Sequence, residues 1–90
     1  MTNLKRVFLI GASGMGMAPL ALYLKGAGIQ IEAYDDCFKE PLRSILENEG
    51  IRVLSEPNPI EKPDCVIRSS AIPEDSNLVS PWISQNIPVY

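Results

Sequence analysis

A glycine-rich segment near the amino terminus has the spacing of a phosphate-binding turn. It reads Gly11-Ala12-Ser13-Gly14-Met15-Gly16 and follows the apolar residues 7–10. Glycines between a strand and a helix let the backbone approach a ligand closely, and the free N–H groups of the helix attract an anion. Leu9 occupies the first position of the Gly-x-Gly-x-x-Gly motif of dinucleotide enzymes. The segment predicts a phosphate or pyrophosphate site, and the alternative is a turn needed only for close packing of helix on strand.

An acidic pair ends the next apolar segment. Asp35 lies 21 residues after Gly14, and Asp36 follows it. A carboxylate at this position can accept hydrogen bonds from ribose hydroxyls, each such bond contributing about 1.5–3 kcal/mol. The distance from the glycines favours Asp35 over Asp36 for this role. The alternatives for Asp35 are a solvated acid at a strand end and an N-cap for the following turn.

A third polar segment, Arg68-Ser69-Ser70-Ala71-Ile72-Pro73-Glu74-Asp75, follows a later apolar run. Its small hydroxyl side chains offer hydrogen-bond donors, and Pro73 restricts the turn. Judged by residue type alone, this segment is a polar connection.

Strand and helix signals alternate along the chain, which predicts an α/β fold. Continuous or alternating apolar runs predict strands at 7–10, 29–34, 51–54, 64–68 and 87–90. Apolar spacing of three and four, with proline and glycine at the ends, predicts helices at 17–28, 41–49 and 80–85. We expect Pro41 and Pro81 at first helical positions and Ser80 as an N-cap, whereas Pro19 lies where a helix beginning at residue 13 or 14 needs an N–H.

This alternation predicts a five-stranded parallel sheet in the order 3-2-1-4-5 with right-handed crossovers. Such sheets bind ligands at the carboxyl ends of their strands, where the strand order reverses. The three polar segments should therefore converge at one edge of the sheet.

Composition narrows the function classes. The 90 residues are 46% hydrophobic and carry a net charge of −3 with no basic run, which disfavours a nucleic-acid partner. The absence of histidine excludes Ser/His/Asp and Cys/His catalysis within this chain. Cys37 and Cys65 are too far apart in sequence for a Cys-x-x-Cys site and are expected to be reduced thiols. Residues 7–10 are too short to span a membrane, so we expect a cytoplasmic protein with no membrane partner.

The three segments together resemble a known family. The segments 10–16, 69–75 and 87–89, with the Asp35 strand end, resemble in matching order the N-terminal domain of the UDP-N-acetylmuramate L-alanine ligases, the first of the peptidoglycan Mur ligases. The resemblance extends over essentially all 90 residues, and the serine-rich segment is its most specific part. It implies a Rossmann-like three-layer α/β/α domain, residues 1–90, that binds the UDP part of UDP-N-acetylmuramic acid.

The resemblance also implies roles for individual residues. Gly11, Ala12, Ser13, Gly14 and Met15 would bind the pyrophosphate, and Asp35, Ser70, Ala71 and Ile72 would bind the uridine. In such ligases a central domain binds ATP and magnesium and a C-terminal domain binds L-alanine, which attacks an acyl phosphate of the substrate. These 90 residues contain no phosphate loop with lysine. We therefore expect this chain to have no catalytic residues, metal or cofactor of its own, and the other two domains to be its partners in a longer enzyme.

Other interpretations remain open at this point. A nicotinamide or flavin dinucleotide module would explain the glycines and Asp35, but the missing first glycine at Leu9 weighs against it. The related ligase that recycles muropeptides has a similar glycine loop. An interaction domain with a vestigial pocket is the third possibility.

Overall fold

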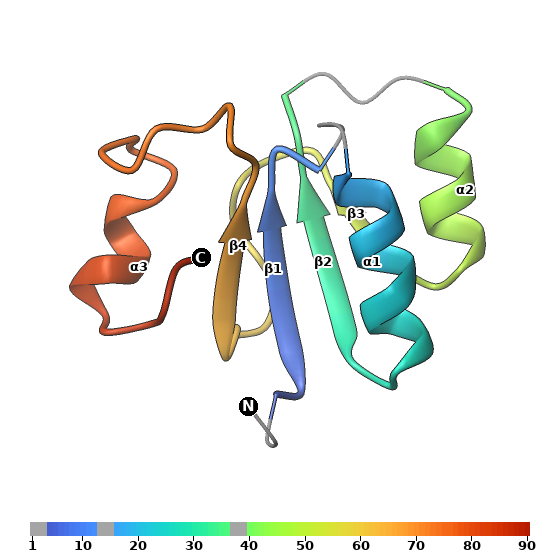
Figure 1. Cartoon of the computed structure of the whole chain (residues 1–90), viewed down its shortest axis with the longest axis horizontal. Helices are drawn as coiled ribbons and strands as arrows, with labels where there is room; N and C mark the ends of the chain where they lie inside the picture. Colours follow the sequence, from blue (N-terminus) through green and yellow to red (C-terminus); the bar gives the residue numbers. More distant parts are fainter. Residues whose placement is uncertain (1–3, 13–15, 37–39) are drawn as a thin grey trace.

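The structure, a computed structural model, describes residues 4–12, 16–36 and 40–90. Strands and helices alternate along the chain, as the sequence predicts (Figure 1). The strands are β1 (Arg6–Ile10), β2 (Gln30–Tyr34), β3 (Arg52–Leu54) and β4 (Cys65–Arg68). The helices are α1 (Met17–Gly26), α2 (Leu42–Asn48) and α3 (Ser80–Ser84).

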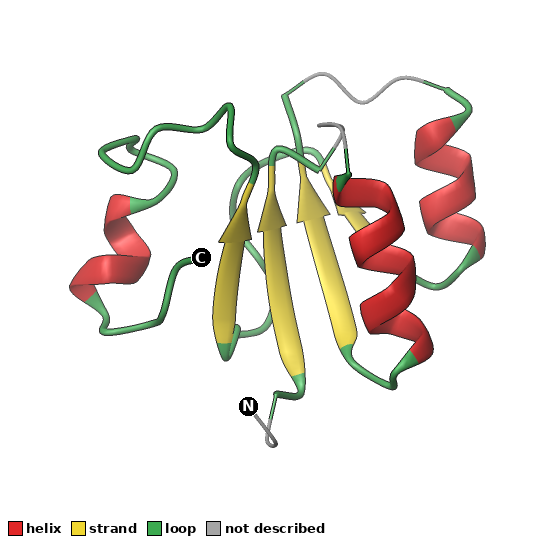
Figure 2. Ribbon diagram, in the orientation of Figure 1, coloured by secondary structure: helices red, strands yellow, loops and turns green. Residues whose placement is uncertain are grey.

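The four strands form one parallel sheet in the order β3-β2-β1-β4 (Figure 2). β1 lies at the centre and pairs with β2 on one side and with β4 on the other. The order reverses between β2 and β4, which are the two neighbours of β1. The parallel architecture and the order of these four strands are therefore confirmed.

The prediction of a fifth strand is wrong for the described residues. Segment 87–90 forms one isolated parallel bridge with β4, between Val89 and Val66. The Val66 N–H donates to the Pro88 carbonyl at 2.9 Å, and the Tyr90 N–H donates to the Val66 carbonyl at 2.9 Å. Pro88 has no N–H with which to extend the ladder toward the start of β4. The segment therefore lies beside the sheet in the predicted place but is not a full strand.

Alternate residues of β1 face opposite layers. Val7 and Leu9 belong to the core beneath α1 and α2, whereas Phe8 and Ile10 belong to the core on the α3 side. The Phe8 ring meets the Trp82 ring of α3 edge-on, with centroids 5.6 Å apart. Figure 1 shows α3 on the opposite side of the sheet from α1 and α2. Because both faces are covered, the central strand is continuously apolar, as is typical of parallel sheets.

The helix starts differ in detail from the prediction. α1 begins at Met17, so Pro19 lies in the first turn, where a backbone N–H needs no partner within the helix. Pro41 is the N-cap residue of α2 and not its first helical residue. Val79 is the N-cap residue of α3, and Ser80 is already helical, so the prediction of Ser80 as N-cap is wrong.

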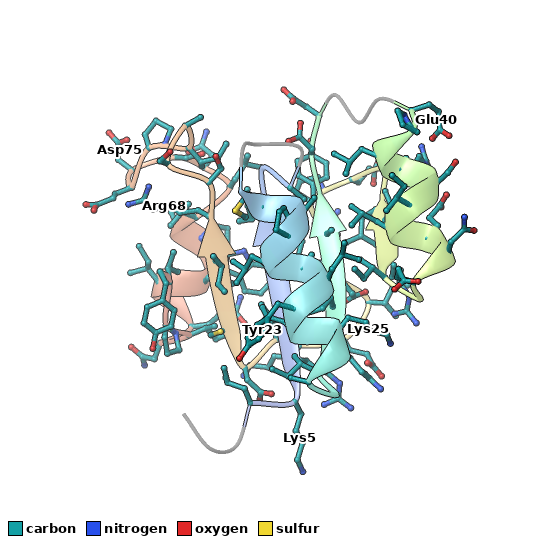
Figure 3. All side chains as sticks on the ribbon, turned by 45° about the vertical axis from the view of Figure 1, so that its right-hand side comes forward. Lys5, Tyr23, Lys25, Glu40, Arg68 and Asp75 are labelled. Atoms are coloured by element: carbon teal, nitrogen blue, oxygen red, sulfur yellow. The ribbon has the colours of Figure 1, made fainter. Side chains whose placement is uncertain are left out.

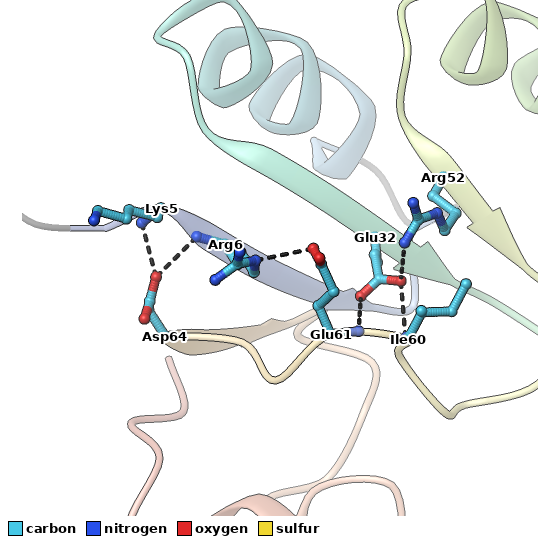
Figure 4. A network of polar contacts seen from close by, with 7 residues as sticks. All are labelled: Lys5, Arg6, Glu32, Arg52, Ile60, Glu61 and Asp64. Atoms are coloured by element: carbon cyan, nitrogen blue, oxygen red, sulfur yellow. Dashed lines mark hydrogen bonds and ion pairs between the residues drawn. The ribbon is translucent and has the colours of Figure 1, made fainter.

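A network of hydrogen bonds and ion pairs joins the proline-containing loop 55–64 to the amino-terminal edge of the sheet (Figure 4). The Glu32 carboxylate accepts the Ile60 N–H at 2.9 Å and pairs with Arg52 at 3.1 Å. The Asp64 carboxylate accepts the N–H groups of Lys5 and Arg6 at 2.8 and 2.9 Å. The Glu32 carboxylate thus satisfies backbone N–H groups of the loop, and the Asp64 carboxylate satisfies those at the start of β1.

Asp64 makes folding stability depend on pH. The backbone hydrogen bonds from Lys5 and Arg6 hold the pKa of the Asp64 carboxyl below its ordinary value. This group therefore stabilises the fold above its unfolded-state pKa, and the contribution disappears as the pH falls through the lower folded-state pKa. We expect Asp64→Asn to flatten the loss of melting temperature between about pH 5 and pH 2, measured by circular dichroism. Parallel curves for the two proteins would contradict a titrating role for Asp64.

Cys65 is a buried core residue, and burial raises the pKa of its thiol, which favours the neutral form. Cys37 lies outside the described residues. No helix in the described part of the chain is long and apolar enough to cross a membrane.

Candidate functional site

A cavity of about 250 Å³ lies at the carboxyl-terminal edge of the sheet, between the ends of β1, β2 and β4. Its walls come from three segments far apart in sequence. The described residues that line it are Gly11, Tyr34, Asp35, Asp36, Ser69, Ala71, Ile72 and Leu78. Parallel strands place their carboxyl ends at one edge, and a crevice opens where the strand order reverses. The predicted convergence of the glycine turn, the acidic pair and the serine-rich segment is therefore seen here.

Gly11 brings the turns after β1 and β4 into close contact. Its φ of +79° is in the left-handed region, which favours glycine. A Cβ atom at Gly11 would lie 2.8 Å from the Ser69 Cβ and 3.1 Å from the Ile72 Cγ1. The absence of a side chain at Gly11 is thus what allows the serine-rich turn to lie against the glycine turn.

The serine-rich turn is held by its own hydrogen bonds. The Ser69 N–H donates to the Ile10 carbonyl at the end of β1, at 2.9 Å. The Ile72 N–H donates to the Ser69 carbonyl at 2.9 Å, and the Ser69 Oγ accepts the Ala71 N–H at 3.2 Å. Ser69 is buried, whereas Ser70 is exposed and is not among the lining residues. Of the predicted uridine contacts in this turn, Ala71 and Ile72 line the cavity and Ser70 lies outside its wall.

The backbone at the start of the glycine turn is already paired. The N–H groups of Gly11 and Ala12 donate to the Tyr34 carbonyl at 2.9 and 3.1 Å. These bonds join the ends of β1 and β2, and they involve two residues that the family resemblance assigns to a pyrophosphate. Ser13, Gly14 and Met15, which were assigned to the same group, lie outside the described residues.

The start of α1 offers further donors for an anion. Gly16 is its N-cap residue, and the first N–H groups of a helix have no partner within it. Pro19 removes one of these donors, leaving those at Met17 and Ala18 within the described first turn. A phosphate at the glycine turn would therefore rely on the N–H groups around the start of the helix, where the helix dipole also favours negative charge.

Asp35 and Asp36 both line the cavity, so position relative to the glycines does not by itself separate them. Tyr34, Ile72 and Leu78, whose side chains are largely apolar, line the same cavity. None of the described lining residues is basic. The described lining therefore suits a neutral group that carries hydroxyls and an apolar face.

The sequence pattern did not identify Tyr34 and Leu78 as lining residues, and it indicated no separate role for Ser69. Tyr34 ends β2 beside Asp35, so its position was readable from the strand. Leu78 follows the serine-rich turn by six residues, and no periodicity marks it. Only the folding of segment 73–79 back over the α3 face brings it to the cavity.

A second cleft, of about 230 Å³, lies at the opposite edge of the sheet. Four of its charged side chains are paired, Arg6 with Glu61 at 2.9 Å and Arg52 with Glu32 at 3.1 Å, and Lys25 also lines it. Among the residues with described positions, no three His, Cys, Asp or Glu side chains gather to hold a metal ion. The carboxyl-edge cavity is the candidate site, because the three predicted polar segments meet there.

Comparison with known proteins gives the family. No family model matches the sequence. A UDP-N-acetylmuramate–L-alanine ligase from Dictyoglomus turgidum is 33% identical over 92 residues, covering 99% of this chain. This chain belongs to the Mur ligases. A second ligase of the same name, from Francisella philomiragia, is 33% identical over 78 residues and covers 84% of the chain. The Mur ligase chain described here spans 19% and 17% of the lengths of these two relatives.

Solved Mur ligases share the fold. The UDP-N-acetylmuramate–alanine ligase of Thermotoga maritima superposes with a TM-score of 0.81 at 20% identity, over 97% of this chain and 20% of its own. A murein peptide ligase from Psychrobacter arcticus gives a TM-score of 0.83 at 19% identity, over 96% of this chain and 18% of its own. A malate dehydrogenase from Cryptosporidium parvum gives only 0.54 at 21% identity, over 83% of this chain and 27% of its own. The chain thus has a Rossmann-like fold, and its likeness to the dehydrogenase structure is weaker than its likeness to the ligase structures.

Proposed function

We propose that this chain binds the UDP part of UDP-N-acetylmuramic acid as the N-terminal domain of a cytoplasmic, ATP-dependent ligase that adds L-alanine in peptidoglycan precursor synthesis. The observation that carries the proposal is the convergence of the glycine turn, the β2 carboxylates and the 69–72 turn on one cavity in a Mur ligase. ATP, magnesium and the amino acid would be bound by the central and C-terminal domains of the longer enzyme, so this chain would bind substrate without catalysing the reaction.

The chemistry of the cavity assigns parts of the ligand to its walls. Carboxylates accept hydrogen bonds, so Asp35 would accept those of the ribose hydroxyls. The base would lie against the apolar side of the cavity, at Ala71, Ile72 and Leu78. Two carboxylates repel a phosphate, so the pyrophosphate would lie toward the glycine turn and the start of α1, where backbone N–H groups and the helix dipole attract it.

The dinucleotide alternative has weaker support. Leu9 occupies the position of the first glycine in the dinucleotide motif. It is a residue of β1, and its side chain is fully buried. It is therefore a strand residue that packs beneath α1, and no glycine turn begins there. Solved ligases of both the alanine-adding and the muropeptide-recycling class have UDP-N-acetylmuramate in their names. The choice between these two classes therefore concerns the second substrate.

Thermal denaturation with different nucleotides tests the proposal. We expect UDP-N-acetylmuramic acid or UDP, present at about one hundred times its dissociation constant, to stabilise the domain by roughly 2.7 kcal/mol. That corresponds to a rise of at least several degrees in the melting temperature of a domain of this size. NAD at the same concentration serves as the control and should give no shift. Stabilisation by NAD without stabilisation by UDP would favour the dinucleotide module instead.

A further inference from the structure

We propose that Arg68 is a positioning residue for the nucleotide cavity, and this inference rests on the proposed function. Arg68 is the last residue of β4 and immediately precedes the serine-rich turn. It does not line the cavity. It would act through the turn 69–72, by fixing where the turn places the Ile72 side chain.

The guanidinium group binds the far arm of the turn at two points. Arg68 Nη1 donates to the Ile72 carbonyl at 2.7 Å, and Nη2 donates to Glu74 Oε1 at 3.1 Å. The Arg68 side chain is only 20% exposed, whereas that of Glu74 is 87% exposed. Figure 3 shows Arg68 next to the loop that carries Asp75. Because an exposed ion pair contributes little, the part-buried bond to the Ile72 carbonyl is the stronger of the two contacts, and the bond to Glu74 orients the guanidinium plane.

Ile72 has little freedom in its position. Its side chain packs with the apolar core on the α3 side and also forms part of the cavity wall. On its other flank the Ile72 Cγ1 would lie only 3.1 Å from a Cβ at Gly11. The near arm of the turn is fixed by the sheet, through the Ser69 N–H and the Ile10 carbonyl. Arg68 supplies the corresponding attachment for the far arm, so that the two arms together fix the shape of the cavity.

The residue type suits this task. A guanidinium presents several N–H donors in a rigid plane, so one side chain can bind two acceptors in a fixed geometry. A lysine ammonium at the same position could reach the Ile72 carbonyl or Glu74 but would not hold both in one plane. Methionine has a comparable unbranched stem and no donor, so Arg68→Met removes the attachment without removing most of the packing.

The experiment compares UDP affinity in three variants of the 90-residue chain by isothermal titration calorimetry, at a temperature where all are folded. We expect Arg68→Met to weaken UDP binding about tenfold, and Arg68→Lys to recover part of that loss. Arg43→Met is the matched control, because it removes an ion pair to Glu47 on α2, away from the cavity. Its UDP affinity should equal that of the unaltered protein.

The readouts separate positioning from general stability. A purely structural Arg68 would lower the melting temperature of Arg68→Met and leave its UDP affinity, measured on folded protein, unchanged; that result overturns the proposal. If Arg68→Met does not fold, Arg68→Lys decides, since equal affinity in Arg68→Lys and the unaltered protein overturns it as well. Failure of the unaltered protein to bind UDP overturns the proposed function, and this inference with it.

Discussion

Replacing Gly11 by alanine should lower the melting temperature by at least about 10 °C and weaken UDP binding. The φ of +79° costs a residue with a Cβ about 1–2 kcal/mol. The new Cβ would also lie 2.8 Å from the Ser69 Cβ, and overpacking of this kind costs about 1–3 kcal/mol. In a domain of this size each kcal/mol shifts the melting temperature by roughly 4–8 °C. Because Ser69 and Ile72 must move away, the cavity changes shape together with the loss of stability.

Gly28→Ala is the matched control for Gly11→Ala. Gly28 has a φ of +88°, and nothing lies within 4 Å of a Cβ built there. It therefore carries the backbone strain without the steric overlap, and it lies in the turn between α1 and β2. We expect Gly28→Ala to cost less stability than Gly11→Ala and to leave UDP affinity unchanged. Equal losses of melting temperature in the two variants would show that the contact between the glycine and serine-rich turns is not tight.

Replacing Asp35 by asparagine should weaken UDP binding by roughly 10- to 100-fold, because hydrogen bonds to a charged acceptor contribute about 1.5–3 kcal/mol. Asparagine has nearly the same shape, so the melting temperature without ligand should change little. Asp35 is half-buried at the end of β2 and lines the cavity. Calorimetric titration with UDP, and denaturation without it, measure the two effects separately.

Asp36→Asn tests whether the effect belongs to Asp35. Both carboxylates line the cavity, but Asp36 is exposed. A solvated carboxylate gains less from a ligand hydroxyl than a partly desolvated one, so Asp36→Asn should change the affinity by no more than a few-fold. A larger loss in Asp36→Asn than in Asp35→Asn would assign the ribose contact to Asp36. If UDP affinity is unchanged in both variants, Asp35 and Asp36 are only acids at a strand end.

The sequence alone predicted the layout of the fold. Four of the five predicted apolar runs are strands, and their order is the one expected for a simple sheet of alternating strands and helices. Continuous apolar character in residues 7–10 indicated a strand buried on both faces, and the structure divides these residues between two cores. Because the strands are parallel, their carboxyl ends lie at one edge of the sheet. The glycine turn, the acidic pair and the serine-rich turn therefore lie at that edge. Each of these conclusions depends on local pattern and on chain connectivity.

The sequence did not reveal how backbone groups pair with distant segments. The segment 87–90 has the composition of a strand, yet it makes only one bridge, because Pro88 lacks the N–H that the ladder to β4 requires. Pyrophosphate binding by Gly11 and Ala12 stays a prediction, and the structure shows that their N–H groups are bound to the Tyr34 carbonyl on the neighbouring strand. Local sequence does not reveal which carbonyl a given N–H will meet across a sheet.

By itself, the sequence determined which residues could form a ligand site and at which edge of the sheet they come together. The tertiary structure decided which of them face the cavity. Ala71 and Ile72 line it, whereas Ser70 does not, and Tyr34 and Leu78 join them. The physical reason is that residue type and spacing limit the available chemistry, while the direction of a side chain in a turn is set by contacts with distant segments. Here those contacts are the Cβ-free surface of Gly11 and the guanidinium of Arg68.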